Sequence, residues 1–92
     1  MADFEARLLA PAEAFLRTLR DEQRERVGRL LDLLEMDPRI DGRHKILVPV
    51  PPASFSCYVD SEFWILYHLV HNTEVRVLNI DFAENEVTPW RE

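Results

Sequence analysis

The sequence predicts an α+β domain in which an N-terminal helical hairpin packs on a small antiparallel sheet. Two observations support this prediction. The first half of the chain carries apolar residues at helical spacing, and the second half carries apolar runs and period-two alternation, which are typical of strands. The predicted order is β-α-α-β-β-β, and this segregation of helices from most of the strands is characteristic of α+β folds.

The first helix is expected directly after a short strand. Residues 1–9 alternate between apolar and charged side chains, which predicts a strand with one face in water. Pro11 suits the first turn of a helix, where its missing N–H costs nothing. The apolar residues that follow predict a helix from about residue 11 to residue 20.

The second helix has clearer limits. Asp21 is expected to cap its N-terminus. One buried stripe is predicted by four residues at i, i+3, i+4 and i+7, namely Val27, Leu30, Leu31 and Leu34. The helix is expected to end near Met36, because Asp37 precedes Pro38 and this step disfavours helix.

The second half of the chain predicts the sheet. The run "ILVPVPP" over residues 46–52 is interrupted by prolines, so it is either an edge strand or an extended loop. Further strands are predicted over residues 54–59, 63–70 and 74–82, with "HNT" as the turn before the last of them. The last ten residues are expected to pack over the sheet.

Length and composition predict one domain over residues 1–92, because a chain of 92 residues has no room for two cores. Such a domain is stable by about 5–10 kcal/mol, and a second copy or another subunit can add to this. No apolar run approaches the roughly 20 residues of a membrane span, and the N-terminus does not resemble a secretory signal. We therefore expect a cytoplasmic protein.

The chain offers no pattern for a disulfide, a metal or another cofactor. Cys57 is the one cysteine, and no His, Cys and Asp residues stand at ligand spacing. We expect Cys57 to be a buried small apolar residue rather than a nucleophile. The formal net charge of −6 also disfavours broad binding of nucleic acid.

The basic residues concentrate in the stretch "DPRIDGRHK", residues 37–45. It holds Arg39, Arg43, His44 and Lys45, the last being the single lysine of the chain. Three interpretations stay open: a solvated turn after the second helix, where cations are favourable, a surface for a partner or nucleic acid, and a catalytic site.

The connector "DPR..G..K", together with "ILYHL" followed by "VRVLNI", resembles the RelE/ParE toxin superfamily of bacterial type II toxin–antitoxin modules. The resemblance implies a cognate antitoxin as partner, and as target either mRNA on the ribosome or DNA gyrase. Gly42 and Lys45 match the family connector. Trp64 stands where many members of the family have an arginine. Ser56 and Tyr58 stand in the preceding strand, where family members often have further arginines.

If the chain carries out the RNA cleavage that the resemblance implies, the chemistry of that reaction indicates which residues would take part. That reaction needs proton transfer and stabilisation of a charged phosphorane. Lys45 and Arg76 would supply charge to the phosphate, and His44 or His68 would transfer protons. Partner or RNA contacts are assigned to Arg39, Arg43, Trp64, Tyr58, Trp90 and Arg91.

Each of these residues also has a structural interpretation. Arg76 can pair with Glu74 or Glu62, and His68 can be a hydrogen-bonded residue of the sheet. Trp64 can pack against a helix. The alternative function is therefore a catalytically silent protein-interaction subunit of the same fold, or a gyrase-directed toxin that needs a binding surface but no catalysis.

Overall fold

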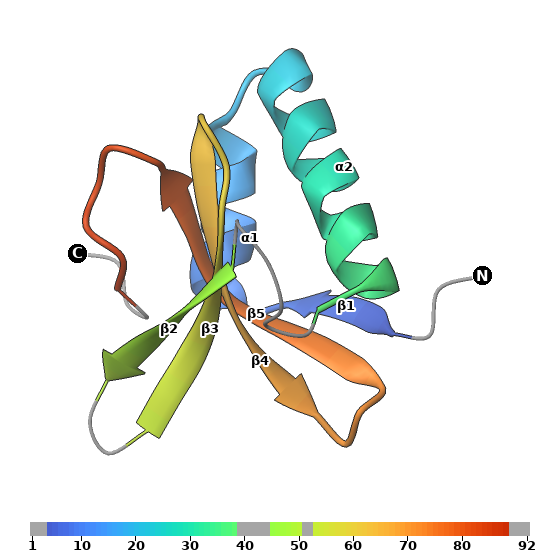
Figure 1. Ribbon diagram of the computed structural model, residues 1–92. Helices are drawn as coiled ribbons and strands as arrows, with labels where there is room; N and C mark the ends of the chain where they lie inside the picture. Colours follow the sequence, from blue (N-terminus) through green and yellow to red (C-terminus); the bar gives the residue numbers. More distant parts are fainter. Residues whose placement is uncertain (1–3, 39–44, 51–52, 89–92) are drawn as a thin grey trace.

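The computed structural model describes residues 4–38, 45–50 and 53–88, which form two helices and a five-stranded sheet (Figure 1). The elements are β1 (Glu5–Leu8), α1 (Ala10–Thr18), α2 (Asp21–Met36), β2 (Lys45–Val50), β3 (Ala53–Val59), β4 (Phe63–Val70) and β5 (Glu74–Phe82). The predicted α+β class is confirmed, with both helices before the last four strands.

The sheet is mixed rather than wholly antiparallel. Its strand order is β1-β5-β4-β3-β2. The pairs β2–β3, β3–β4 and β4–β5 are antiparallel. β1 runs parallel to β5, with Glu5 opposite Glu74 and Leu8 opposite Val77. Parallel neighbours need a long connection, and the two helices with the intervening strands provide it.

β2 forms the edge of the sheet opposite to β1. Of the two interpretations of the proline-rich run, the edge strand is therefore confirmed for residues 45–50. Pro49 cannot donate a backbone hydrogen bond, and an edge strand tolerates this loss. With β2 the described part of the chain has one strand more than the order β-α-α-β-β-β.

The helices begin and end close to their predicted limits. α1 has Pro11 in its first turn, and it ends at Thr18 because Leu19 has extended backbone angles. α2 begins at Asp21, so this residue lies inside the helix and is not the cap that we expected. The N–H of Arg20 donates instead to Oε1 of Gln23 at 3.0 Å. The predicted end at Met36 is confirmed.

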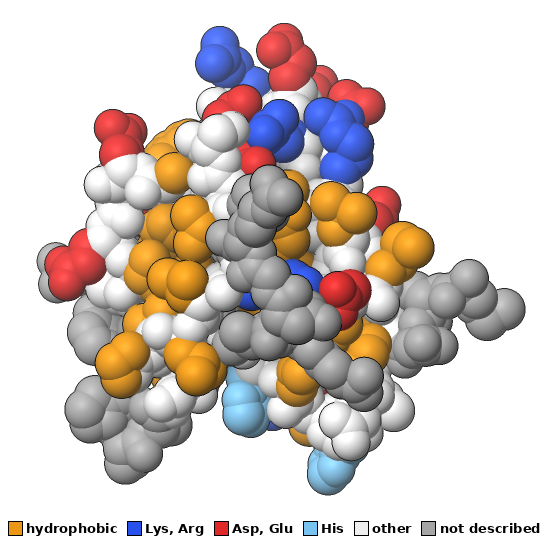
Figure 2. Space-filling view, viewed as in Figure 1, with side chains coloured by type: hydrophobic (Ala, Val, Ile, Leu, Met, Phe, Trp, Pro, Cys, Tyr) orange, Lys and Arg blue, Asp and Glu red, His pale blue; other side chains and the backbone are white. Residues whose placement is uncertain are grey.

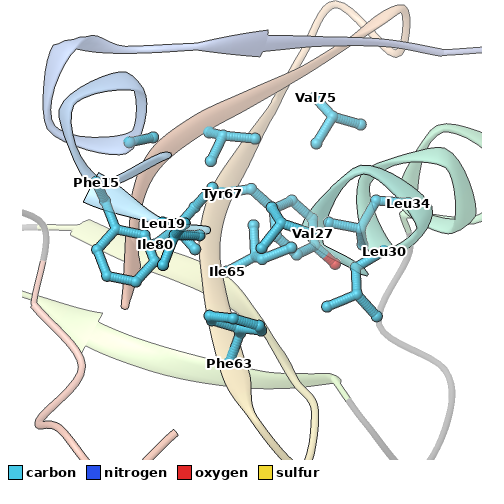
Figure 3. Close-up of a cluster of buried hydrophobic side chains, with 12 residues drawn as sticks. Phe15, Leu19, Val27, Leu30, Leu34, Phe63, Ile65, Tyr67, Val75 and Ile80 are labelled. Carbon is cyan, nitrogen blue, oxygen red and sulfur yellow. The ribbon is translucent and has the colours of Figure 1, made fainter. Parts of the chain in front are cut away.

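The main core lies between the helices and one face of the sheet (Figure 3). The stripe on α2 is buried as predicted, with Val27, Leu30 and Leu34 at most 7% exposed and Leu31 packed beside them. From α1, the Phe15 ring meets the rings of Phe63 and Phe82 edge-on, with centroids 6.1 and 5.2 Å away. Both helices therefore cover the same face of the sheet.

A second, smaller cluster lies on the other face of the sheet, which we call the outer face. Its buried members are Cys57, Trp64 and Leu66, and Val48, Phe55, Leu78 and Val87 pack against them. The apolar character of β4 on both sides follows from this arrangement, because its alternate residues enter different clusters. The segment after β5 returns across the outer face. There the carbonyl oxygens of Asn85 and Thr88 accept hydrogen bonds from Trp64 Nε1 at 3.0 Å and Asn79 Nδ2 at 2.9 Å.

Candidate functional site

The outer face brings together two of the predicted catalytic residues. His68 on β4 and Arg76 on β5 stand directly opposite each other in the antiparallel register. Residues opposite each other point to the same side of a sheet. Their chain neighbours Tyr67 and Val77 point into the main core, so His68 and Arg76 point to the outer face. There His68 is exposed and Arg76 is partly exposed. A proton donor or acceptor and a guanidinium are therefore adjacent at this end of the outer face.

The neighbours of this pair constrain both side chains. Arg76 Nε lies 2.8 Å from Oε2 of Glu74, which confirms the predicted ion pair within β5. The imidazole of His68 lies edge-on to the ring of Phe55, with centroids 6.0 Å apart and planes at 86°. The charge of Arg76 is thus partly neutralised, and one side of His68 faces an aromatic ring.

Lys45 points to the opposite side of the sheet. It stands across from Tyr58, whose side chain packs against the main core. The Lys45 side chain is 11% exposed, and Nζ lies 3.3 Å from Oδ2 of Asp37 at the end of α2. The two residues assigned to phosphate charge, Lys45 and Arg76, therefore lie on different faces of the sheet.

Two of the three aromatic residues assigned to partner or RNA contact, Trp64 and Tyr58, take part in packing. Trp64 is 1% exposed and lies in the outer-face cluster. Tyr58 is half-buried on the helix side of β3. Packing therefore takes up the Trp64 ring, whereas the Tyr58 ring stays partly accessible.

The remaining predicted residues lie outside the described part of the chain. They are Arg39, Arg43, His44, Trp90 and Arg91. Their proposed roles stay as predictions.

Sequence analysis missed one residue of this surface. Arg7 on β1 stands opposite Arg76, so Arg7, Arg76 and His68 form one row across three adjacent strands. The alternation of residues 1–9 placed Arg7 on the water face of a strand. The sequence carries no signal that would place Arg7 beside Arg76, because their proximity depends on the parallel pairing of β1 with β5.

The shifted pKa values of Cys57 and Asp60 agree with structural positions for both groups. Burial raises the pKa of the Cys57 thiol to about 12, so the prediction that Cys57 is not a nucleophile agrees with its environment. At Asp60, burial opposes ionisation, but the Arg26 guanidinium and nearby backbone N–H groups outweigh it and lower the pKa of the carboxyl. Arg26 binds both oxygens of Asp60, at 2.9 and 3.0 Å, and so joins α2 to the β3–β4 turn.

The described residues do not group any three His, Cys, Asp or Glu side chains in a way that could hold a metal ion. In the same part of the chain, neither helix is long and apolar enough to cross a membrane.

Comparison with solved structures identifies the fold. The chain is similar to a chain of the toxin–antitoxin complex RelBE2 from Mycobacterium tuberculosis, with a TM-score of 0.74 and 18% identity over 87% of this chain and 98% of the other. It is also similar to a chain of the archaeal RelE–RelB complex from Pyrococcus horikoshii OT3, with a TM-score of 0.71 and 11% identity over 91% and 99%. The chain has a RelE-like fold. No protein-family model and no curated protein matches its sequence.

The RelE-like fold agrees with the resemblance that the connector and the two central strands predicted. At 11% and 18% identity the likeness establishes the architecture and leaves the chemistry of the outer face to the residues of this chain.

Proposed function

We propose that the chain is the toxin-type subunit of a two-protein toxin–antitoxin module and that a separate antitoxin protein binds it. The observation that carries the proposal is the likeness of fold. It spans 87% and 91% of this chain and nearly the whole of two chains that come from toxin–antitoxin complexes. The proposal places the protein in the cytoplasm, where the ribosome and DNA gyrase lie.

Exposed apolar side chains support a protein partner. Leu33 and Met36 on α2 are 50% and 67% exposed, and Ile46 and Leu47 on β2 are 48% and 63% exposed. Figure 2 shows hydrophobic side chains on the side of the molecule that carries β2, β3, the end of β5 and the segment after it. Large apolar side chains left exposed on a small domain are candidates for contact with a protein partner.

If the chain cleaves mRNA on the ribosome, His68 and Arg76 are the described residues that can act together. His68 would transfer a proton, and Arg76 would stabilise charge on the phosphorane. His44 and Lys45 keep their predicted roles in this mechanism only if they reach the RNA from the connector. The pairing of His68 with Arg76 across β4 and β5 supports a site made of these two residues.

A catalytically silent subunit is the second candidate, and the ion pairs favour it. Arg76 is paired with Glu74 and Lys45 with Asp37, so each assigned cation already has a carboxylate beside it. A phosphate would have to displace or share these carboxylates. A gyrase-directed toxin fits the same observation, because it requires a binding surface and no phosphate site.

Expression without and with a partner tests the proposal. The chain alone should arrest bacterial growth, and co-expression of the protein encoded beside its gene should restore it. A cleavage assay with programmed ribosomes then separates the candidates. A nuclease should lose activity in His68→Ala and Arg76→Ala, by roughly a hundredfold each, and keep it in the surface control Arg29→Ala. Growth arrest with intact message would leave the gyrase-directed reading, and the absence of both effects would leave the silent subunit.

A further inference from the structure

Charged residues are ordered in two rows at one end of the outer face, where β1, β5 and β4 lie side by side (Figure 1). The basic row consists of Arg7, Arg76 and His68, which stand opposite one another on the three strands. The acidic row consists of Glu5 and Glu74, which are also opposite each other. The two rows are two residues apart along the strands.

Each row places like charges on neighbouring strands. Like charges placed directly opposite each other on neighbouring strands repel, whereas alternating signs would attract. Within the described residues, the one ion pair that joins the two rows is Arg76 with Glu74, and Arg7 has no ion pair. Among the described residues, the Arg7 guanidinium is thus the group of the rows that is most open to a carboxylate from outside the chain.

The surface beside the rows is hollowed. A depression of about 540 Å³ is lined by Glu5, Ala6, Arg7, Thr73 and Glu74, at the β1 edge of the sheet. Three of these five residues belong to the rows. A side chain that enters the depression would meet a carboxylate and a guanidinium at once.

We propose that the two rows bind an extended segment of the partner protein that carries an acidic and a basic side chain two residues apart. This inference rests on the proposed function, and it adds where and by what chemistry the antitoxin is recognised. In an extended segment residues i and i+2 point to the same side about 6.7 Å apart, which is also the spacing of the rows along β1 and β5. The acid would face Arg7 and Arg76, and the base would face Glu5 and Glu74.

Charge complementarity selects a protein segment over a nucleic acid. The acidic row lies beside the basic row, and the whole chain carries a net charge of −6. A polyanion would gain from one row and be repelled by the other. A segment with both signs pairs with both rows, and a guanidinium can bind a carboxylate through two hydrogen bonds.

Charge reversal in each row tests the proposal. The probe is the protein encoded beside the gene of this chain, and its affinity is measured by titration calorimetry. Arg7→Glu and Glu5→Lys should each weaken the complex by about tenfold, since each puts like charges together at a contact. Arg17→Glu, on the exposed side of α1, makes the same change in charge as Arg7→Glu away from the rows and should leave the affinity unchanged. Circular dichroism confirms that each variant is folded.

The outcomes separate this inference from the proposed function. If the wild-type chain binds the neighbouring protein and both row variants bind equally well, the docking site is wrong and the module stands. If Arg7→Glu weakens binding but Glu5→Lys strengthens it, the ligand of the rows is a polyanion and the inference is overturned. If the wild-type chain does not bind the neighbouring protein at all, the proposed function fails together with the inference.

Discussion

Replacement of Trp64 by phenylalanine should destabilise the domain without touching its surface. Trp64 is 1% exposed, and its Nε1–H donates to the carbonyl oxygen of Asn85 at 3.0 Å. Phenylalanine keeps an aromatic ring in the outer-face cluster but removes the hydrogen bond and part of the packed volume.

The magnitude follows from these two losses. The hydrogen bond contributes about 1 kcal/mol, and the volume lost between indole and phenyl contributes about 1–2 kcal/mol as a partly collapsed cavity. The free energy of unfolding should therefore fall by about 2–3 kcal/mol, from about 5–10 kcal/mol for a domain of this size. With a slope of about 1.5 kcal/mol per M, the urea midpoint should fall by roughly 1.3–2 M.

Urea denaturation followed by far-UV circular dichroism measures this change. Val59→Ala is the matched control, because Val59 stands opposite Trp64 on the same face but is 36% exposed, so its truncation should cost less than about 1 kcal/mol. The reasoning is refuted if Trp64→Phe leaves the midpoint unchanged while it weakens the complex with the proposed antitoxin. That result would return Trp64 to the binding surface that the sequence predicted.

Three further predictions follow from individual residues. Despite burial, which opposes ionisation, the pair with Arg26 lowers the folded-state pKa of Asp60. The stability that this pair adds is therefore complete above the unfolded pKa of about 3.9 and is lost as the pH falls through the folded pKa. Asp60→Asn should unfold at a lower urea concentration than wild type at pH 7, and the difference should shrink toward pH 2. Cys57, with its pKa raised to about 12, should resist iodoacetamide at pH 8 and react once urea unfolds the chain, as mass spectrometry would show; rapid labelling of the folded protein would contradict its burial. Arg7→Gln removes a like charge opposite Arg76 and should leave the free energy of unfolding unchanged or raise it by about 0.2–0.5 kcal/mol in thermal or urea denaturation, whereas a clear loss would mean that Arg7 stabilises the monomer.

The local elements could be predicted because their signals are periodic. The spacing of Val27, Leu30 and Leu34 requires a helix with one buried face, and Pro38 limits where that helix can continue. β4 was recognisable because both of its faces are apolar, which the two clusters explain.

The pairing of distant strands could not be predicted in the same way. β1 and β5 are separated by most of the chain, and nothing in their own residues distinguishes a parallel neighbour from an antiparallel one. The face on which Lys45 lies depends on its register with Tyr58, because a shift of one residue reverses every side chain of a strand.

The candidate site was affected most by these long-range relations. His68 and Arg76 were chosen for their chemistry, and the register between β4 and β5 makes them neighbours. Arg7 was passed over because it lies far away in sequence. Trp64 was assigned to a partner or RNA surface because it stands where many members of the resembled family have an arginine, yet the returning segment after β5 covers that face with Val87 and the Asn85 carbonyl.

The most direct test of the account is complex formation between this chain and the protein encoded beside its gene. The two proteins should elute together from a size-exclusion column, with light scattering that gives the mass of a complex containing both chains. The complex should also release bacteria from the growth arrest caused by the chain alone. Separate elution of two folded proteins at micromolar concentration would contradict the claim that this RelE-like chain is one half of a toxin–antitoxin pair.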